Sequence, residues 1–514
     1  MSKKTSYLLG IDVGTSGLKA ILIDRAGKVV TSALVEYPLL TPKPGWAEQE
    51  PEAWWKAAVK AIGLVRKQAK ARAEEIAGVG LTGQMHGSVF LDKDNQVIRP
   101  ALLWCDQRTA AECDEITQRV GGLPELLRLT GNQALTGFTA PKVLWLRNQE
   151  PKHYERVRRL LLPKDYIRFR LTGEYVIDVA DASGTLLFDV KARTWSNAVL
   201  DRLGIRRDIL PQAMESPEVS GRVTAAGAKA SGLAAGTPVV AGAGDQAAGG
   251  VGNGITREGI ISSSLGTSGV MFAYAKEPNV DSQGRLHTFC HGVPGAWHVM
   301  GVMLSAGGSF RWYRDALNGD LVAAAKKKRV DPYELMTAEA KKAPAGCEGL
   351  IFLPYLMGER TPYPDPNARA VFFGLHARHT RPHLTRSVME GVTFGLRDSL
   401  ELMGLLNIPV REIRASGGGA KSPFWCQMQA DIFNAPVVTI NVNEGPAFGA
   451  ALLAAVGTGA FKSVPEACDA TIRVARRWDP DPKQAGLYDE LYGVYRTMYG
   501  AVKDRYEALA KLAK

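Results

Sequence analysis

The feature of this 514-residue chain that most constrains its fold is a short glycine-bounded segment that occurs twice. Asp-Val-Gly-Thr-Ser-Gly spans residues 12–17, and Ser-Leu-Gly-Thr-Ser-Gly spans residues 264–269, about half a chain later. Each copy follows a β-rich run and precedes a second apolar run, which is the pattern of a hairpin. An internal repeat at this spacing indicates two related α/β lobes. We place the boundary at a glycine-rich stretch, which gives domains of residues 1–250 and 251–514.

The beginning of the chain predicts a β-β-β-α-β order. The three β-rich runs, separated by short glycine-containing loops, are residues 7–13, 18–23 and 29–37. Pro51 suits the first position of a helix, and the apolar residues that follow it recur on one helical face. Residues 79–82 then read as a buried strand. At the far end, residues 487–512 predict one long helix that packs on its own lobe.

Composition narrows the class of protein. Hydrophobic residues make up 46% of the chain, which excludes a disordered or fibrous protein. The net charge is +11, but the basic residues are dispersed, and the one tight run, residues 326–329, follows an Ala-rich helical stretch. We interpret it as a solvated helix end and expect no nucleic-acid partner. The six cysteines form no CxxC pair, and neither a leader nor an apolar run of about 18 residues is recognised. We therefore expect a cytoplasmic protein with free thiols and no membrane partner.

Three glycine segments predict contacts with a nucleotide. A Gly-Thr-Ser-Gly turn exposes consecutive backbone N–H groups, and such a nest binds anions. One copy alone is equally consistent with an ordinary hairpin turn, but two facing copies can hold a polyphosphate from both sides. The third segment, residues 417–419, follows a strand-like run and precedes a predicted helix. Its glycines allow the backbone to approach a ligand closely, although a flexible turn is the alternative.

Two aspartates and one histidine stand at predicted strand ends. Asp12 lies beside the first glycine turn, where a buried carboxylate is costly unless it is paired or binds a metal such as Mg²⁺. Asp245 follows an apolar strand and is either a helix N-cap or a general base for phosphoryl transfer. His86, between glycines, is either a structural histidine or a substrate contact. We favour the metal role for Asp12 and the base role for Asp245.

Two groups of residues imitate zinc sites, and we reject both. They are His287, Cys290 and His291, and separately His376, His379 and His383. The first group lacks a convincing fourth ligand. The second is interrupted by Pro382 and lies among arginines.

Several longer segments carry a family resemblance. Residues 137–145 (Gly-Phe-Thr-Ala-Pro-Lys-Val-Leu-Trp), residues 372–375 (Phe-Phe-Gly-Leu) with 383–390, and residues 84–87 (Gln-Met-His-Gly) resemble signatures of the FGGY carbohydrate kinases. Further matches are residues 45–49, 162–166 and 353–362. The resemblance covers almost the whole chain and is strongest to the members that act on D-xylulose.

This resemblance implies a fold and an activity. The fold would be α/β, with two ribonuclease-H-like lobes of the actin and hexokinase type flanking a deep catalytic cleft. ATP and Mg²⁺ would bind mostly against the C-terminal lobe, and a ketopentose would bind against the N-terminal lobe. The implied reaction is the ATP-dependent phosphorylation of D-xylulose to D-xylulose 5-phosphate.

The resemblance also implies site residues. Asp245 would be the catalytic base that takes the proton of the C5 hydroxyl, and Asp12 would be the second catalytic carboxylate and the metal ligand. The predicted substrate-binding residues are Met85, His86, Trp104, Asp106, Asp245 and Gln246. The predicted nucleotide-binding residues are Gly14, Thr15, Ser16, Gly266, Thr267, Gly307, Gly418, Gly419 and Ser422. Cys105 and Gln246 depart from the asparagines that some relatives carry, which bears on the sugar that is preferred.

Alternatives remain at this point. The sugar could be D-ribulose, L-xylulose, another ketose or a polyol. The chain could instead be a nucleotide switch of the actin or chaperone type that has no sugar substrate. A basic nucleic-acid binder is a distant third. A homodimer is one candidate assembly.

Overall fold

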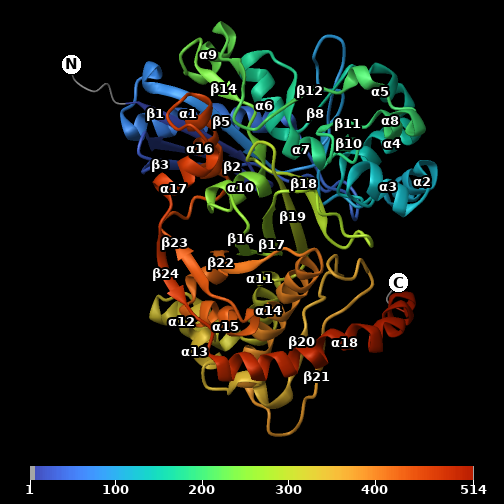
Figure 1. Ribbon diagram of the computed structural model, residues 1–514, viewed down its shortest axis with the longest axis vertical. Coiled ribbons are helices and arrows are strands. Elements are labelled where there is room, and N and C mark those ends of the chain that lie inside the picture. Colours follow the sequence, from blue (N-terminus) through green and yellow to red (C-terminus); the bar gives the residue numbers. More distant parts are fainter. Residues whose placement is uncertain (1–5, 513–514) are drawn as a thin grey trace.

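The computed structural model describes residues 6–512, which form two α/β lobes that each contain a seven-stranded sheet (Figure 1). The first sheet has the order β13-β14-β5-β1-β2-β3, with β15 also paired to β5. Its strands are β1 (Tyr7–Val13), β2 (Gly17–Asp24), β3 (Val29–Glu36), β5 (Ile76–Gly83), β13 (Val219–Arg222), β14 (Pro238–Val240) and β15 (Ala243–Gly244). The second sheet has the order β18-β19-β17-β16-β22-β23-β24. Its strands are β16 (Gly259–Leu265), β17 (Gly269–Ala275), β18 (His287–Cys290), β19 (Trp297–Met303), β22 (Val410–Gly417), β23 (Val437–Ile440) and β24 (Val474–Trp478).

The remaining elements surround these sheets. The helices before α11 are α1 (Pro51–Ala69), α2 (Ala110–Val120), α3 (Leu123–Thr130), α4 (Thr139–Gln149), α5 (Pro151–Arg156), α6 (Pro163–Thr172), α7 (Val179–Ser183), α8 (Asn197–Leu203), α9 (Ala225–Ser231) and α10 (Asp245–Gly252). The later helices are α11 (Gly307–Leu317), α12 (Gly319–Lys328), α13 (Pro332–Ala340), α14 (Arg381–Leu405), α15 (Pro423–Phe433), α16 (Pro446–Gly457), α17 (Val464–Thr471) and α18 (Pro482–Leu512). Short strands are β4 (Glu48–Gln49), β6 (Val89–Leu91), β7 (Ala101–Leu102), β8 (Arg159–Leu161), β9 (Val176–Asp178), β10 (Phe188–Asp189), β11 (Thr194–Trp195), β12 (Gln212–Met214), β20 (Ile351–Leu353) and β21 (Val371–Phe373).

The repeated sequence segment marks a repeat in the fold. β1 pairs antiparallel with β2 and parallel with β5, and β16 pairs in the same way with β17 and β22. Five strands of each sheet therefore follow one order, β3-β2-β1-β5-β14 in the first lobe and β19-β17-β16-β22-β23 in the second. Each Gly-Thr-Ser-Gly turn joins the first hairpin of its sheet. The predicted α/β class with two related lobes is confirmed.

The predicted elements at the two ends of the chain are also confirmed. β1, β2, β3, α1 and β5 reproduce the expected β-β-β-α-β opening, with a two-residue strand, β4, before α1. Helix α18 begins at Pro482 rather than at residue 487, because Asp481 accepts a hydrogen bond from the backbone N–H of Lys483 at 2.9 Å and starts the helix there. Its residues Tyr488 and Tyr495 are buried in the core of the second lobe.

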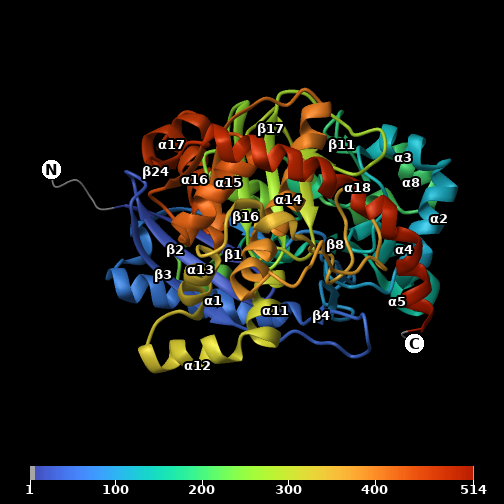
Figure 2. The same ribbon diagram turned by 90° about the horizontal axis from the view of Figure 1, so that it is seen from below.

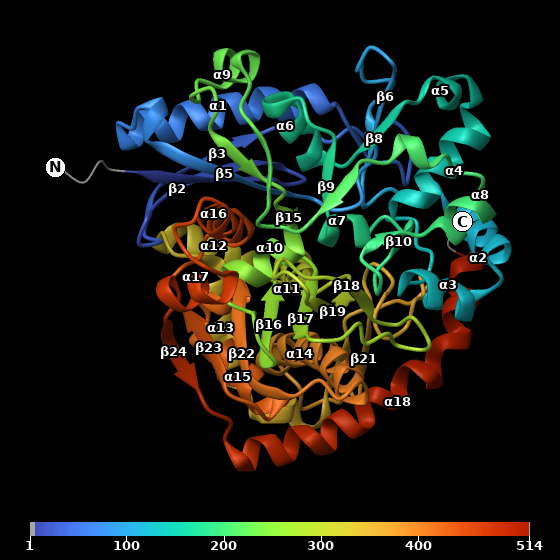
Figure 3. The ribbon, with the colours of Figure 1, turned by 45° about the horizontal axis from the view of Figure 1, so that its top comes forward.

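Helix α16 comes from the second half of the chain but packs against β1 and β5 of the first sheet. A side chain at Gly10 would overlap the Ala447 carbonyl oxygen, and one at Gly80 would overlap that of Ala450. Helices α10 and α16 each follow the last core strand of their repeat. These two helices also lie in close contact with each other, since a side chain at Gly449 would overlap the carbonyl oxygen of Ala248. Figure 3 shows this helix pair between the two sheets. The lobes are therefore joined by a packed helix pair.

Two expectations about the surface can be compared with the structure. Helix α12 lies at the outer edge of the second lobe (Figure 2), and residues 326–329 at its C-terminal end are exposed, as expected for a solvated helix end. Within residues 6–512, no helix combines the length and the apolar character that a membrane span requires.

Candidate active site

A cavity of about 560 Å³ lies between the lobes and contains both predicted acidic residues, Asp12 and Asp245. Its first-lobe lining also includes Lys19 and Gln246. Its second-lobe lining comes from β16, β17, β22, β23 and the segments that follow the latter two strands, and includes Ser264 and Gly417. Asp12 and Ser264 occupy equivalent positions of the sequence repeat. The pseudo-symmetry of the fold therefore brings the two repeats to one cavity.

Asp12 stands near the end of β1, opposite Lys19 on β2 and Thr82 on β5. Burial and then the charge of Asp245 raise the pKa of its carboxyl group, the Lys19 ammonium opposes both, and the resulting pKa is about 7. Its Oδ1 atom has no hydrogen-bond partner within residues 6–512. A buried carboxylate oxygen without a partner, beside a second carboxylate, fits a divalent cation, because the cation would compensate both charges.

Asp245 is the first residue of α10 and lies where the first sheet faces the second lobe. Burial raises the pKa of its carboxyl group to about 6, while a hydrogen bond from Gln246 Nε2 at 3.4 Å acts in the opposite direction. Such a carboxylate is ionised near neutral pH yet is basic enough to accept a proton from an alcohol. Gly244 fixes its neighbourhood, since a Cβ atom there would lie 2.8 Å from Met85 Cγ. The residue that precedes the predicted base therefore packs against the predicted sugar-binding segment.

The first glycine turn is held by side chains from other segments of the first lobe. The Gly14 N–H donates to the Gly17 carbonyl at 3.1 Å and closes the turn. Trp104 Nε1 donates to Thr15 Oγ1 at 2.9 Å, and Gln84 Nε2 donates to the Gly14 carbonyl at 3.4 Å. Ser16 is exposed at the tip. Trp104, which we predicted to bind the sugar, therefore contacts the predicted phosphate turn as well.

The second glycine turn is bound to the beginning of α11. The Gly307 N–H donates to the Gly266 carbonyl at 2.9 Å, and the Gly308 N–H donates to the Thr267 carbonyl at 3.0 Å. A side chain at Gly307 would overlap the Gly266 carbonyl oxygen, so this approach requires glycine. The structure therefore brings together Gly266, Thr267 and Gly307, which the sequence predicted separately as nucleotide-binding residues.

The third glycine segment follows β22. Gly417 has a positive φ of 76°, and a Cβ atom there would lie 2.6 Å from the Leu265 carbonyl oxygen. Gly418 is exposed, whereas Gly419 is buried against Leu265. Ser422 caps α15 by accepting a hydrogen bond from the Trp425 N–H at 3.3 Å. A nucleotide role for these residues stays a prediction, which the position of Gly417 on the cavity wall supports.

The predicted sugar-binding segment is rigidly held. His86 has a positive φ of 69°, and its Nδ1 donates to the Gly184 carbonyl at 2.7 Å. The His86 carbonyl accepts bonds from Lys142 Nζ at 3.0 Å and Thr139 Oγ1 at 3.1 Å. Burial and then the charge of Lys142 lower the pKa of the imidazole well below its usual value, so the ring is neutral. Because Nδ1 carries the proton, Nε2 is left as a hydrogen-bond acceptor.

Asp106 and Gln246 lie in different surroundings. The Asp106 carboxylate accepts hydrogen bonds from the Ala47 N–H at 2.7 Å and from two nitrogens of Arg108 at 2.9 and 2.7 Å. A direct sugar contact by Asp106 stays a prediction and would require these bonds to rearrange. Gln246 lines the cavity beside Asp245.

Lys19 and Glu444 line the cavity but were not predicted from the sequence. Lys19 Nζ lies 2.5 Å from Glu444 Oε2, an ion pair that joins the two sides of the cleft. Lys19 was detectable as the single charged residue in the apolar run 18–23. Glu444 had no comparable signal, because it lies in an irregular segment between β23 and α16.

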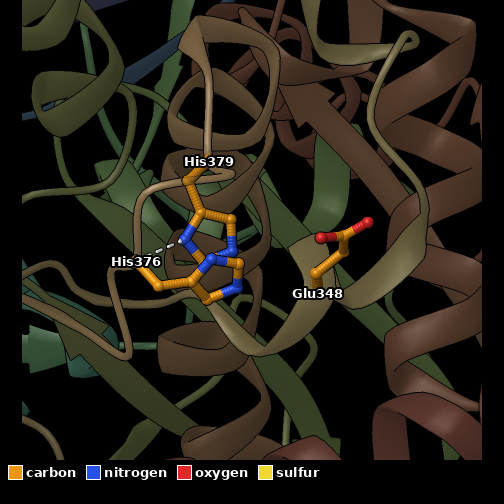
Figure 4. Close-up of side chains that lie close together, drawn as sticks. All are labelled: Glu348, His376 and His379. Atoms are coloured by element: carbon orange, nitrogen blue, oxygen red, sulfur yellow. Dashed lines mark hydrogen bonds between the residues drawn. The ribbon is translucent and has the colours of Figure 1, made fainter.

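Of the second group of histidines that imitates a zinc site, His376 and His379 lie close to Glu348, which the sequence did not include in that group. His376 and His379 lie beside Glu348, as Figure 4 shows, and their ring centroids are 3.8 Å apart. The His376 N–H donates to His379 Nδ1, and the Arg378 N–H donates to His376 Nδ1. These bonds place the ring protons on Nε2, so neither ring offers a free nitrogen to a metal. The arrangement gives no reason to revise the rejection of a zinc site.

Two lobes with repeated glycine turns around a shared acidic cavity define a two-domain phosphotransferase with the actin/hexokinase-like fold. The chain belongs to the FGGY family of carbohydrate kinases: the N-terminal domain of that family matches residues 7–252, and the C-terminal domain matches residues 261–458.

Individual relatives agree with this assignment. The chain is 39% identical over 508 residues to a xylulose kinase of Bacillus subtilis (strain 168), which covers 99% of both chains. It is 40% identical over 497 residues to a xylulose kinase of Lactococcus lactis, which covers 96% of both. A ligand-bound xylulose kinase from Lactobacillus acidophilus superposes with a TM-score of 0.91 at 29% identity, over 98% of this chain and 100% of that one.

Proposed function

We propose that this carbohydrate kinase transfers the γ-phosphoryl group of ATP to the C5 hydroxyl of D-xylulose, producing ADP and D-xylulose 5-phosphate. The observation that carries the proposal is the shared interlobe cavity, which contains Asp12 and Asp245 and is walled by the segments after β22 and β23. The full-length similarity to several enzymes named xylulose kinase supports the choice of sugar.

Asp245 supplies the base. Its ionised carboxylate accepts the hydroxyl proton while the sugar oxygen forms a bond to the γ-phosphorus and the bond to the β,γ-bridging oxygen breaks. The oxygen that leaves stays on ADP, so atoms and charge balance. The position of Asp245 at the N-terminus of α10, directly after Gly244, which packs against Met85, suits a group that must reach a bound sugar.

Asp12 and Lys19 would compensate the negative charge of the nucleotide phosphates, Asp12 through a bound metal ion and Lys19 directly. Asp12 would hold a Mg²⁺ ion, which would supply neutralisation of the phosphate charge. Lys19 carries a positive charge on the wall of the same cavity. The glycine turns that follow Asp12 and Ser264 would contact the phosphates. ATP, as a cytoplasmic metabolite, makes the cytoplasm the expected place of the reaction.

The test is an ADP-release assay over a panel of D-xylulose, L-xylulose, D-ribulose and the corresponding polyols. We expect D-xylulose to give the highest kcat/KM and an ADP release that depends on sugar. A higher kcat/KM with another sugar would replace the substrate but keep the activity. ADP release at the same rate without any sugar would instead favour a nucleotide switch.

A further inference from the structure

We propose that His287 and Arg360, both from the second lobe, complete the sugar site and bind the carbonyl end of the ketose. This inference rests on the proposed function, because it identifies how the same site tells a ketose from a polyol. Two contacts place His287 near the predicted sugar-binding segment. Gly244, next to Asp245, packs against Met85, which precedes His86. The ring of Phe138 contacts the rings of both His86 and His287.

His287 is a buried polar residue without a partner. His287 is 2% exposed, and neither nitrogen of its ring has a hydrogen-bond partner within residues 6–512. The ring stacks on Phe289 at 5.7 Å and meets the edge of Phe138 at 5.6 Å. Phe138 lies 4.7 Å from His86 on its other side. A buried imidazole with two unsatisfied nitrogens costs stability, and a bound ligand is one explanation for its presence.

The strand that carries His287 is fixed to the first lobe. The neighbouring Thr288 exchanges two hydrogen bonds with the side chain of Asn132, at 2.8 and 3.2 Å. The Cys290 N–H donates to Ser183 Oγ at 3.0 Å. His287 is therefore held against the side of the cleft on which His86 lies.

Arg360 approaches the same place from a loop after β20. The Thr361 N–H donates to the Val302 carbonyl at 3.1 Å, and Glu359 accepts from the Leu304 N–H at 2.9 Å, so the loop is anchored at the end of β19. No hydrogen bond or ion pair of the Arg360 guanidinium group is found within residues 6–512. Burial, followed by the charge of Arg360, lowers the pKa of His287 to about 3, and the same charge contributes to lowering the pKa of His86. The Thr361 hydroxyl also donates to the Arg285 carbonyl at 2.9 Å, two residues before His287, so the loop that carries Arg360 lies beside the start of β18.

The chemistry of the pair matches a ketose. A neutral imidazole offers one donor and one acceptor, which suits a hydroxyl group, whereas a guanidinium group only donates. A carbonyl oxygen only accepts hydrogen bonds. It can therefore accept one from the arginine, and it has no O–H group that would need an acceptor of its own. A polyol carries a hydroxyl group at that carbon, and its proton must find another partner beside a cation. The pair therefore favours the ketose.

The experiment compares three full-length variants. His287→Phe keeps a ring of similar size and removes both nitrogens, and Arg360→Met keeps the length and removes the donors. His298→Phe is the matched control, because His298 is 0% exposed and stacks on Phe272 at 4.3 Å rather than on Phe138. Among the described residues its two ring nitrogens likewise find no hydrogen-bond partner. The measurements are KM for D-xylulose, KM for ATP, the ketose-to-polyol ratio of kcat/KM, and the equilibrium Kd for sugar without nucleotide.

We expect His287→Phe and Arg360→Met to raise KM and Kd for D-xylulose at least tenfold and KM for ATP less than twofold. Arg360→Met should also lower the ketose-to-polyol ratio at least tenfold, with partial recovery in Arg360→Lys. The control should change each value less than twofold. Unchanged sugar KM in both variants, or a change no larger than in the control, overturns the inference. If the wild-type protein phosphorylates another ketose best, the same comparison is made with that ketose, which separates this inference from the choice of D-xylulose.

Discussion

Asp12 and Asp245 face one cavity from two different elements, β1 and α10, and the charge of Asp245 raises the pKa of Asp12. Burial raises the pKa of both carboxyl groups, but only Asp12 has a lysine nearby to oppose the shift. This difference agrees with a division of labour in which Asp12 faces the phosphate and metal side and Asp245 faces the hydroxyl group.

Replacing Asp245 by Asn should remove the base while keeping the shape of the side chain. We expect kcat to fall about 10²–10⁴-fold, which is the range for loss of a general base. The Kd for sugar should change less than threefold, since Met85 and His86 are untouched. An ADP-release assay and a binding titration measure the two effects, with Asp504→Asn on the exposed face of α18 as the control. A near-normal kcat in Asp245→Asn would contradict the assignment.

The activity should depend on pH through Asp245. Its pKa is raised by burial to about 6, and the base must be ionised to act. At saturating Mg²⁺, which keeps Asp12 ionised, the kcat/KM for sugar should therefore decline as the pH falls through about 6, with a limiting slope of one. An ordinary exposed aspartate would place this limb near 4. A profile that stays flat down to pH 5 would argue against Asp245 as the group that titrates.

Asp12 should support activity but lower the stability of the folded protein when no metal is bound. Its folded-state pKa of about 7 lies above the ordinary aspartate value of 3.8, so its ionisation between those values opposes folding, and stability is lost as the pH rises. Asp12→Asn should therefore melt at least about 2 °C higher than wild type at pH 8 without metal. The difference should vanish near pH 4.

The same Asp12→Asn variant should lose most of its Mg²⁺-dependent activity. Thermal melts over a pH series, together with ADP release over a Mg²⁺ series, check both halves of the prediction. Asp504→Asn again serves as the control. A melting difference that does not depend on pH would show that the ionisation of Asp12 is not its cause.

The contact between α10 and α16 should not tolerate a methyl group. Gly449→Ala would overlap the Ala248 carbonyl oxygen, and overpacking of this kind costs about 1–3 kcal/mol. Gly493→Ala in α18 is the matched control, because no atom of residues 6–512 outside the adjoining helix turn lies within 4 Å of the added Cβ atom. That change should leave stability equal or raise it by roughly 0.5–1 kcal/mol. Chemical denaturation measures both, and equal stability of the two variants would refute the tight-contact interpretation.

The local features of the fold could be predicted from the sequence. The β1–β2–β3 run, helix α1 and the long helix α18 each carry their own periodicity and turn residues, and the repeat of Gly-Thr-Ser-Gly revealed the second lobe. The position of α16 could not be predicted, because its sequence, residues 446–457, is apolar on nearly all sides and does not specify which sheet it covers. Long-range packing decides that position.

The candidate site shows a similar limit. The strand ends at Asp12 and Asp245 were visible because a carboxylate after an apolar run is unusual. Trp104 and Asp106 were placed near the sugar, yet they form hydrogen bonds with Thr15 and Ala47, which only the folded chain brings near. The pairing of Lys19 with Glu444 depends on the two lobes meeting and has no signature in either segment alone.

The location of α16 means that neither half of this duplicated architecture is self-sufficient. A fragment that stops at residue 250 would leave the face of β1 and β5 uncovered, with Gly10 and Gly80 facing solvent where α16 now sits. The second half, in turn, would present an apolar helix with nothing to cover it. The two halves are thus held together by α16, a helix of the second half that covers the sheet of the first. Any opening of the cleft has to rotate the lobes about these close glycine contacts, because no flexible linker among residues 6–512 joins the packed surfaces there.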